Sequence, residues 1–227
     1  MTGIPHLLVH EHNDNVGVVV VAAVGNSGPD GRSDCQHPDY PGGASHSICC
    51  PGCVETAIGV GSFNDYDEVV GHSSRGPTWP GAYTGETLDK PDIVAPGYGI
   101  LAAAMGGGHV SFSGTSMATP GAAGVAALML QANPDLSPFD IRNIMQETAT
   151  YRQCHYMAAN EPCLEDLIPK NRQNNVYGHG EVRALDALIE AAERDYAFNS
   201  NISVIVSTPA TLDNRIHLER GDSIAFE

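Results

Sequence analysis

The sequence predicts an α/β domain in which helices pack on a doubly wound, mostly parallel sheet, and two stretches carry this prediction. Val18–Val24 is an unbroken apolar run rich in β-branched residues, typical of a strand that is buried on both faces. Gly121–Leu130 is a run of small and apolar residues that predicts a buried helix. Its small residues would let this helix pack tightly against the sheet.

Length and charge narrow the class of protein. The 227 residues suffice for one domain with a substantial core. The 27 acidic residues outnumber the 11 basic ones, for a formal net charge of −16. Such a chain is a poor partner for nucleic acid or an anionic membrane surface, and no apolar run approaches the ~20 residues of a membrane-spanning helix.

The first predicted strand ends in a turn-rich loop, Gly25–Pro29. The loop follows the carboxyl end of the strand, where open α/β sheets bind their ligands. Asn26 is therefore a candidate for a functional side chain, although Asn-Ser-Gly-Pro is also ordinary turn chemistry.

The predicted helix is preceded by Gly114–Pro120, which brings Ser116 to its N-terminus. Free N–H groups and the helix dipole there favour negative charge, which suits a nucleophile whose attack creates an oxyanion. The simpler interpretation is that Ser116 only caps the helix, because serine is a preferred N-cap residue.

A second helix is predicted after Asn133–Leu136. Ser137 is expected to cap it, Pro138 suits its first turn, and Asp140 completes a capping box.

The heptapeptide Gly114–Pro120 resembles the nucleophile motif of the subtilisin-like serine proteases, the subtilases, and Gly25–Gly28 resembles the segment that carries their oxyanion asparagine. Further stretches resemble other segments of that family, so that the likeness covers roughly residues 16–190. These stretches are Pro51-Gly52 with Ala57–Gly61, Ser73–Pro77, Lys90–Gly97, Asn133–Ala149 and Tyr177–Leu185.

The resemblance implies roles for individual residues. Ser116 would be the acylated nucleophile, and the Asn26 side chain with the Ser116 N–H would form the oxyanion hole. Ala23, Val24 and Gly25 would line the pocket for the substrate side chain before the scissile bond. The remaining residues assigned to substrate binding are Cys49 and Cys50, beside that pocket, and Gly114 and Thr115, before the nucleophile.

The other two members of the catalytic triad are not found in the sequence. In subtilases the Asp and His motifs precede the oxyanion asparagine, and neither precedes Asn26. His10 and His12 are interpreted as exposed helix residues and His109 as part of a glycine-rich loop, so no histidine is assigned as the base. We therefore expect residues 1–194 to be the C-terminal part of a subtilase catalytic domain, a three-layer fold lacking its first strands.

Six cysteines suggest disulfides, because the family is mostly secreted. Four of them, Cys35, Cys49, Cys50 and Cys53, cluster in a turn-rich insertion, while Cys154 and Cys163 flank a second loop. Zinc binding is an alternative, because Cys50-x-x-Cys53 has the spacing of zinc ligands and Cys35, His37 and Cys49 could complete the site; free buried thiols are a third possibility. The pairing within the cluster cannot be obtained from the sequence.

Residues 195–227 are expected to form a short β-rich tail, the start of an appended domain. Ile202, Val204 and Val206 alternate with neighbouring residues as in a strand, and Arg220–Asp222 is typical of a hairpin turn.

The sequence thus predicts a serine endopeptidase that acts on peptides or proteins. It would need no cofactor for its chemistry, and the structural calcium common in the family cannot be assigned to residues. We expect the Asp and His to come from a segment outside this sequence, and family and cysteine content favour an extracellular location. The alternatives are a peptide-binding subtilase homologue without catalysis and a cysteine-rich metal-binding module.

Overall fold

The computed structural model describes residues 17–28, 47–78, 87–151 and 173–194. The elements within these ranges, in chain order, are the strands β1 (Val21–Ala23), β2 (Ile58–Phe63), β3 (Ile93–Pro96), β4 (Ile100–Ala103) and β5 (His109–Phe112), followed by the helices α1 (Thr115–Ala132), α2 (Pro138–Glu147) and α3 (Ala184–Glu193).

Three strands form a parallel sheet in the order β1-β2-β3. The Cα register pairs Val21 with Ile58 and Val60 with Ile93. This parallel sheet, with helices packed against it, confirms the predicted α/β class.

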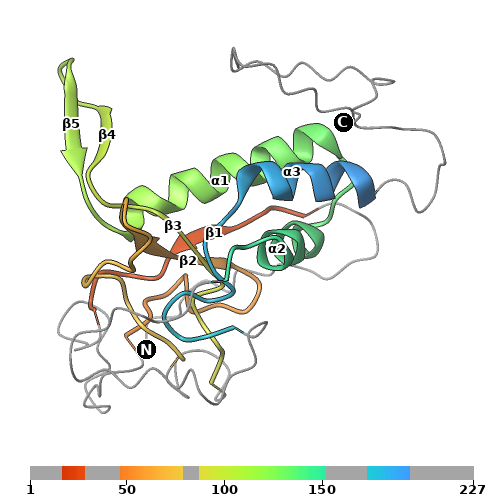
Figure 1. Cartoon of the computed structure of the whole chain (residues 1–227), viewed down its shortest axis with the longest axis horizontal. Coiled ribbons are helices and arrows are strands. Elements are labelled where there is room, and N and C mark those ends of the chain that lie inside the picture. The colour runs from red at the N-terminus through yellow and green to blue at the C-terminus, as the bar shows by residue number, and fades with distance from the viewer. Residues whose placement is uncertain (1–16, 29–46, 79–86, 152–172, 195–227) are drawn as a thin grey trace, which may run out of the picture.

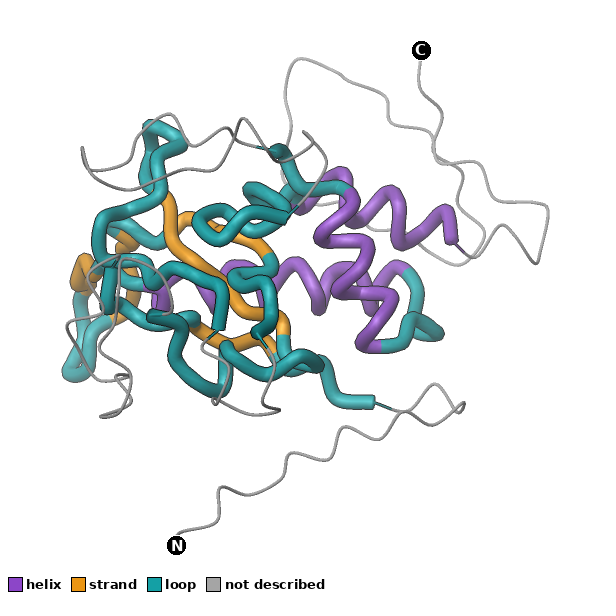
Figure 2. Tube along the Cα trace, turned by 90° about the horizontal axis from the view of Figure 1, so that it is seen from below, coloured by secondary structure: helices purple, strands orange, loops and turns teal. Residues whose placement is uncertain are grey.

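Strand alternation distributes the apolar side chains of this sheet between two faces, because successive residues of a strand point to opposite sides. The larger core joins the sheet to all three helices. Its members include Ile58 and Val60 of β2, Ile93 and Ala95 of β3, Ala122 and Met129 of α1, Ile141 and Ile144 of α2, and Ala187 and Ala191 of α3. Figure 2 shows the three helices gathered together, apart from most of the loops.

Smaller cores beside the sheet are packed by segments without helices. Ala22 and Val24 contact Ile48, Cys53 and Val54. In a second small core, Val94 packs with Val69, Val176 and Tyr177. In the part of the chain that is described, the expected third layer is thus made of loops.

The first strand is shorter and more exposed than the sequence predicts. Hydrogen bonds from Ile58 N to Val20 O and from Val24 N to Val60 O extend its pairing to residues 20–24. Val18, however, is 76% exposed. The prediction of a strand buried on both faces is wrong at this end, because β2 pairs with β1 on one side and β1 has no second neighbour in the described sheet.

Helix α1 is only half buried. Ala118, Ala122, Val125, Ala126 and Met129 pack into the core. The other side of the helix faces outward; its exposed residues are Gly121, Ala123, Gly124, Ala127 and Leu128. A Cβ added at Gly121 or Gly124 would meet no atom within 4 Å. These glycines therefore do not serve the close packing against the sheet that the sequence suggests.

The predicted start of the second helix is confirmed. Ser137 is the N-cap of α2, its hydroxyl accepts a hydrogen bond from Asp140 N at 3.1 Å, and the Asp140 carboxylate accepts one from Ser137 N at 3.0 Å. Pro138 occupies the first turn of the helix, where its missing N–H costs nothing.

An antiparallel hairpin of β4 and β5 leads into α1 (Figure 1). The sequence does not predict this hairpin and indicates only a glycine-rich loop around His109. Gly106, Gly107 and Gly108 all have positive φ at the tip of the hairpin, and His109 is the first residue of β5. Alternation is weak in both strands, so the triple glycine is the main signal that the sequence offers.

Some of the predicted features fall outside the described residues. These are the β tail at 195–227 and the residues Cys35, Cys154, Cys163, His10 and His12. Within the described ranges, no helix combines the length and apolarity that crossing a bilayer requires.

Candidate active site

The loops after β1 and β3 meet the start of α1 at one edge of the sheet. Gly97, just after β3, donates its N–H to Phe63 O at 3.0 Å and accepts from Gly114 N at 2.8 Å. A Cβ at Gly97 would stand 2.4 Å from Ser62 Oγ and 2.7 Å from Gly114 O. Only glycine therefore allows the loop before α1 to lie this close to the ends of the strands.

Asn26 lies directly against this loop. Its Oδ1 accepts hydrogen bonds from Thr115 N at 2.9 Å and from Thr115 Oγ1 at 3.1 Å. A backbone N–H can only donate, so this contact identifies the amide atom that faces Thr115 as the oxygen. The Asn26 Nδ2 consequently points elsewhere with its two protons, and it has no hydrogen-bond partner among the described residues.

Ser116 is the second residue of α1, and its side chain is exposed. The N-cap is Gly114, without a side-chain capping bond. The interpretation of Ser116 as a simple helix cap is therefore wrong. Its N–H is one of the donors that a helix start leaves without an intrahelical partner, and no described residue accepts from it. Among the described residues, neither the Ser116 N–H nor the Asn26 NH₂ has an acceptor, and the Asn26 amide bonds to Thr115, the residue before Ser116.

A second loop, residues 72–75, hydrogen-bonds to the residues on both sides of Asn26. Ser74 N donates to Gly25 O at 3.0 Å, and Ser27 N donates to Ser74 Oγ at 3.1 Å. Gly28 N donates to His72 O at 2.8 Å. The Ser73–Pro77 turn can be recognised in the sequence, but this supporting role cannot, because the contacts span more than 40 residues of chain.

The residues assigned to the specificity pocket lie together. Cys49 N donates to Val24 O at 2.8 Å, and a Cβ at Gly52 would stand 2.7 Å from Ala23 O. Gly25 has φ 103°, and a Cβ there would stand 2.4 Å from Cys49 Sγ. The 49–53 segment therefore packs on the backbone of 23–25.

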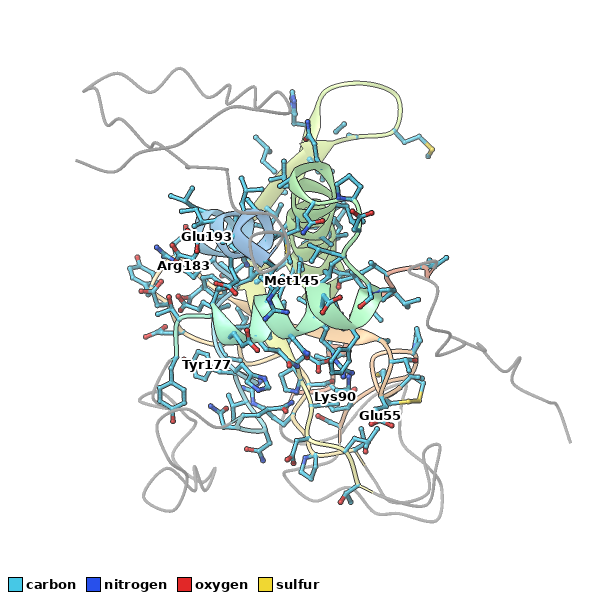
Figure 3. The ribbon with its side chains drawn as sticks, turned by 90° about the vertical axis from the view of Figure 1, so that its right-hand side faces the viewer. Glu55, Lys90, Met145, Tyr177, Arg183 and Glu193 are labelled. Carbon is cyan, nitrogen blue, oxygen red and sulfur yellow. A yellow bond between two sulfur atoms is a disulfide. The ribbon has the colours of Figure 1, made fainter. Side chains whose placement is uncertain are left out.

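Cysteines in this segment are oxidised. Cys50 and Cys53 form a disulfide (Figure 3), and Cys49 is also disulfide-bonded. The alternative in which Cys50-x-x-Cys53 ligates zinc is wrong for this pair, because sulfur atoms joined to each other cannot serve as thiolate ligands. Nor do the described His, Cys, Asp and Glu side chains gather anywhere in a group of three that could hold a metal.

No described histidine hydrogen-bonds to Ser116. His109 is the first residue of β5, and this strand runs about 10 Å to Phe112 before the chain reaches Ser116. His179 Nδ1 instead lies 3.2 Å from Asp92 O. His72 is half-buried; burial, and then the nearby Arg75 guanidinium, lower its pKa below the ordinary 6.5. Its Nε2 is buried without a hydrogen-bond partner among the described residues.

The Lys90–Gly97 motif has a structural role that its sequence does not reveal. Lys90 is 2% exposed, and its Nζ donates to Ala57 O at 2.7 Å and to Asp92 Oδ2 at 2.5 Å. Asp92 also accepts from Gly59 N at 2.6 Å and from Gln146 Nε2 at 2.9 Å. This buried pair joins the start of β2, β3 and α2, and Figure 3 shows Lys90 below the helix of Met145.

Comparison with known proteins identifies the family of this chain. The profile of the Subtilase family matches residues 5–180. The chain belongs to the subtilase family, a family of serine proteases.

Among individual relatives, the serine protease AprX of Bacillus subtilis (strain 168) is 34% identical over 191 residues, which are 75% of this chain and 35% of AprX. Alkaline elastase YaB of Bacillus sp. (strain YaB) is 37% identical over 134 residues, 59% of this chain and 28% of that protein. The solved structure of the prenylagaramide maturation protease PagA superimposes with a TM-score of 0.52 and 26% identity, covering 77% of this chain and 50% of PagA. The chain thus spans about a third of the length of these curated relatives.

Proposed function

We propose that this chain carries the nucleophile and the oxyanion hole of a subtilisin-like serine endopeptidase. The observation that supports this most directly is the bonding of Asn26. Thr115 engages its Oδ1 through two donors, at 2.9 and 3.1 Å, and so turns the amide to leave Nδ2 available beside the nucleophile loop.

In this proposal, Ser116 Oγ attacks the carbonyl carbon of the scissile peptide bond. The hydroxyl proton passes to a general base, and the carbonyl oxygen becomes an oxyanion that accepts from Asn26 Nδ2 and Ser116 N. Collapse breaks the C–N bond, the base returns the proton to the leaving amine, and an ester on Ser116 remains for water to hydrolyse. Peptide or protein substrates follow from this chemistry.

The base and its orienting carboxylate would come from a segment outside this sequence that carries the Asp and His motifs. We propose that this segment covers the outward side of α1 and the edge of β1. Both surfaces are apolar and open: Leu128 is 45% and Val18 76% exposed, and Gly121 and Gly124 leave room for side chains from a neighbour. The disulfides fit an oxidising compartment, and we propose an extracellular location.

A peptide-binding homologue without catalysis is the second candidate. It is favoured by one observation: among the described residues, no histidine reaches Ser116. In that case the oxyanion donors would bind a peptide carbonyl without acylation.

The two candidates are separated by an active-site-directed fluorophosphonate, whose phosphorus is attacked by an activated serine with loss of fluoride. We expect the 227-residue chain alone to react at a rate barely above background, because no histidine among the described residues hydrogen-bonds to Ser116. Mixed with an N-terminal subtilase segment that carries the Asp and His motifs, it should be labelled at Ser116, as read by peptide mass spectrometry.

The matched control is Ser116→Ala in the same mixture, which should abolish labelling, whereas Ser113→Ala should leave the label in place. If the reconstituted mixture bound the N-terminal segment but acquired no label on Ser116, the binding homologue would be the better description.

A further inference from the structure

We infer that the Cys49 sulfur closes the substrate pocket beside Gly25, so that this chain takes peptides with a small side chain, alanine or smaller, before the scissile bond. The inference rests on the proposed function, since it takes the free donors of Asn26 and Ser116 as the place where the substrate carbonyl binds.

The position of the pocket follows from that carbonyl. A carbonyl oxygen held by Asn26 Nδ2 places the side chain of its residue a few ångströms away, next to the backbone that precedes Asn26. That backbone is Gly25, half-buried with φ 103°. Asn26 is exposed and Cys49 is half-buried, so the Gly25–Cys49 contact lies at the surface that a substrate approaches.

Sulfur occupies the space beside Gly25. A Cβ on Gly25 would stand 2.4 Å from Cys49 Sγ and 3.1 Å from Cys49 Cβ, and its third neighbour would be Ser74 Oγ at 2.9 Å. Even one added carbon would collide there, so little room remains for a branched or aromatic substrate side chain on this side.

Covalent and hydrogen bonds also hold Cys49 in place beside Gly25. Cys49 is disulfide-bonded, and its N–H is bonded to Val24 O. The adjoining Cys50–Cys53 disulfide closes the next turn, and Cys53 is buried in the core with Val24. Ser74 is fully buried and bonded to Gly25 and Ser27. A cross-linked segment cannot swing aside to admit a larger group as a lone side chain could.

The test measures binding of product peptides to the 227-residue chain, because binding needs no general base. Two N-terminally fluorescein-labelled peptides, Ala-Ala-Pro-Ala and Ala-Ala-Pro-Phe with free C-terminal carboxylates, are compared by fluorescence anisotropy. We expect the alanine peptide to bind at least about tenfold more tightly, because a single misplaced methylene in a pocket already costs about tenfold or more and a phenyl ring is larger.

Cys49→Ala should then remove most of this preference by improving the binding of the phenylalanine peptide. The matched control is the double variant Cys50→Ala/Cys53→Ala, which removes a disulfide from the same segment but leaves the sulfur beside Gly25. It should keep the preference for alanine. Circular dichroism establishes that each variant is folded, and Cys49→Ser serves as a second, near-isosteric variant that should retain a part of the preference.

Tighter binding of the phenylalanine peptide by the unaltered chain would overturn the inference, and so would a preference that persists in Cys49→Ala or the absence of binding by either peptide. Failure of the proposed function looks different. Ser116 would then resist the fluorophosphonate in the reconstituted mixture while the peptide preference and its loss in Cys49→Ala remained.

Discussion

The surroundings of Lys90 and the outward side of α1 differ in composition and in exposure: charged side chains are buried at Lys90, whereas apolar residues are exposed on α1. At Lys90, two charged side chains are almost fully buried, and both hydrogen-bond to the groups that enclose them. On α1, small apolar residues face outward and a Cβ at Gly121 or Gly124 would meet nothing. In the first region polar groups are buried and hydrogen-bonded, and in the second apolar residues are left uncovered by any described element.

In this molecule, burial cannot be deduced from residue type. Lys90 and Asp92 are buried because they neutralise each other and bond to three separate backbone or amide groups. Val18, Leu128 and Ala127 are exposed because no described element lies over them. Substitutions in and around these regions should therefore differ widely in their effects.

Lys90→Met should lower the free energy of unfolding by about 3–5 kcal/mol, because it leaves the Asp92 carboxylate buried without its cation. Urea denaturation followed by circular dichroism measures the change. The control is Arg183→Ala, which breaks an ion pair of 3.3 Å whose side chains are about half exposed and should cost at most about 1 kcal/mol. Equal losses for both variants would show that Lys90 does not lock the strands and α2 together.

Asn26→Ala should slow phosphonylation of Ser116 in the reconstituted mixture by about 10²–10³-fold, the magnitude found when a subtilisin loses this kind of donor. Thr115→Val removes only the hydroxyl that bonds to Asn26 Oδ1 and keeps the N–H bond. It should slow the reaction by about fivefold, equivalent to a net hydrogen bond of about 1 kcal/mol. A Thr115 variant as slow as the Asn26 variant would assign the donor role to Thr115 instead.

Gly124→Ala should stabilise the chain by about 0.5–1 kcal/mol, since alanine is the better helix former and its Cβ enters open space. Thermal unfolding measures the gain. The same substitution at Gly97 should be strongly destabilising, because its Cβ would stand 2.4 Å from Ser62 Oγ. If the N-terminal segment covers α1, Gly124→Ala should also weaken its binding; unchanged binding would place the segment elsewhere.

His72 should make the chain less stable in acid. Burial and Arg75 lower its pKa in the folded state below 6.5, so the unfolded chain binds the proton more readily. Its contribution is present above about pH 6.5 and is lost as the pH falls through the lower, folded-state value.

Comparing thermal midpoints at about pH 7.5 and about pH 5, on either side of the ordinary histidine pKa, tests this. His72→Gln should show a smaller fall in thermal midpoint than the unaltered chain. His109→Gln, which replaces an exposed histidine, should show the same fall as the unaltered chain. A larger fall in His72→Gln would mean that the histidine stabilises the fold when protonated.

The candidate residues could be named from the sequence because their signals are local. The Gly114–Pro120 motif, the Gly25–Gly28 loop and the Ser137 capping box each lie within a few residues, where turn and capping chemistry act directly. The shortening of β1 and the exposed side of α1 could not be predicted, since an apolar run shows which residues favour burial but not whether a neighbour is present to bury them.

The family, the parallel α/β class and the candidate residues Ser116 and Asn26 could all be derived from local motifs in the sequence. The orientation of the Asn26 amide, the pairing of Cys50 with Cys53 and the burial of Lys90 against Asp92 became visible with the packed fold. Thr115 fixes the asparagine across 89 residues of chain, and Gln146 reaches Asp92 across 54. Contacts between such distant residues depend on how the strands and helices pack, and no short stretch of sequence contains that information.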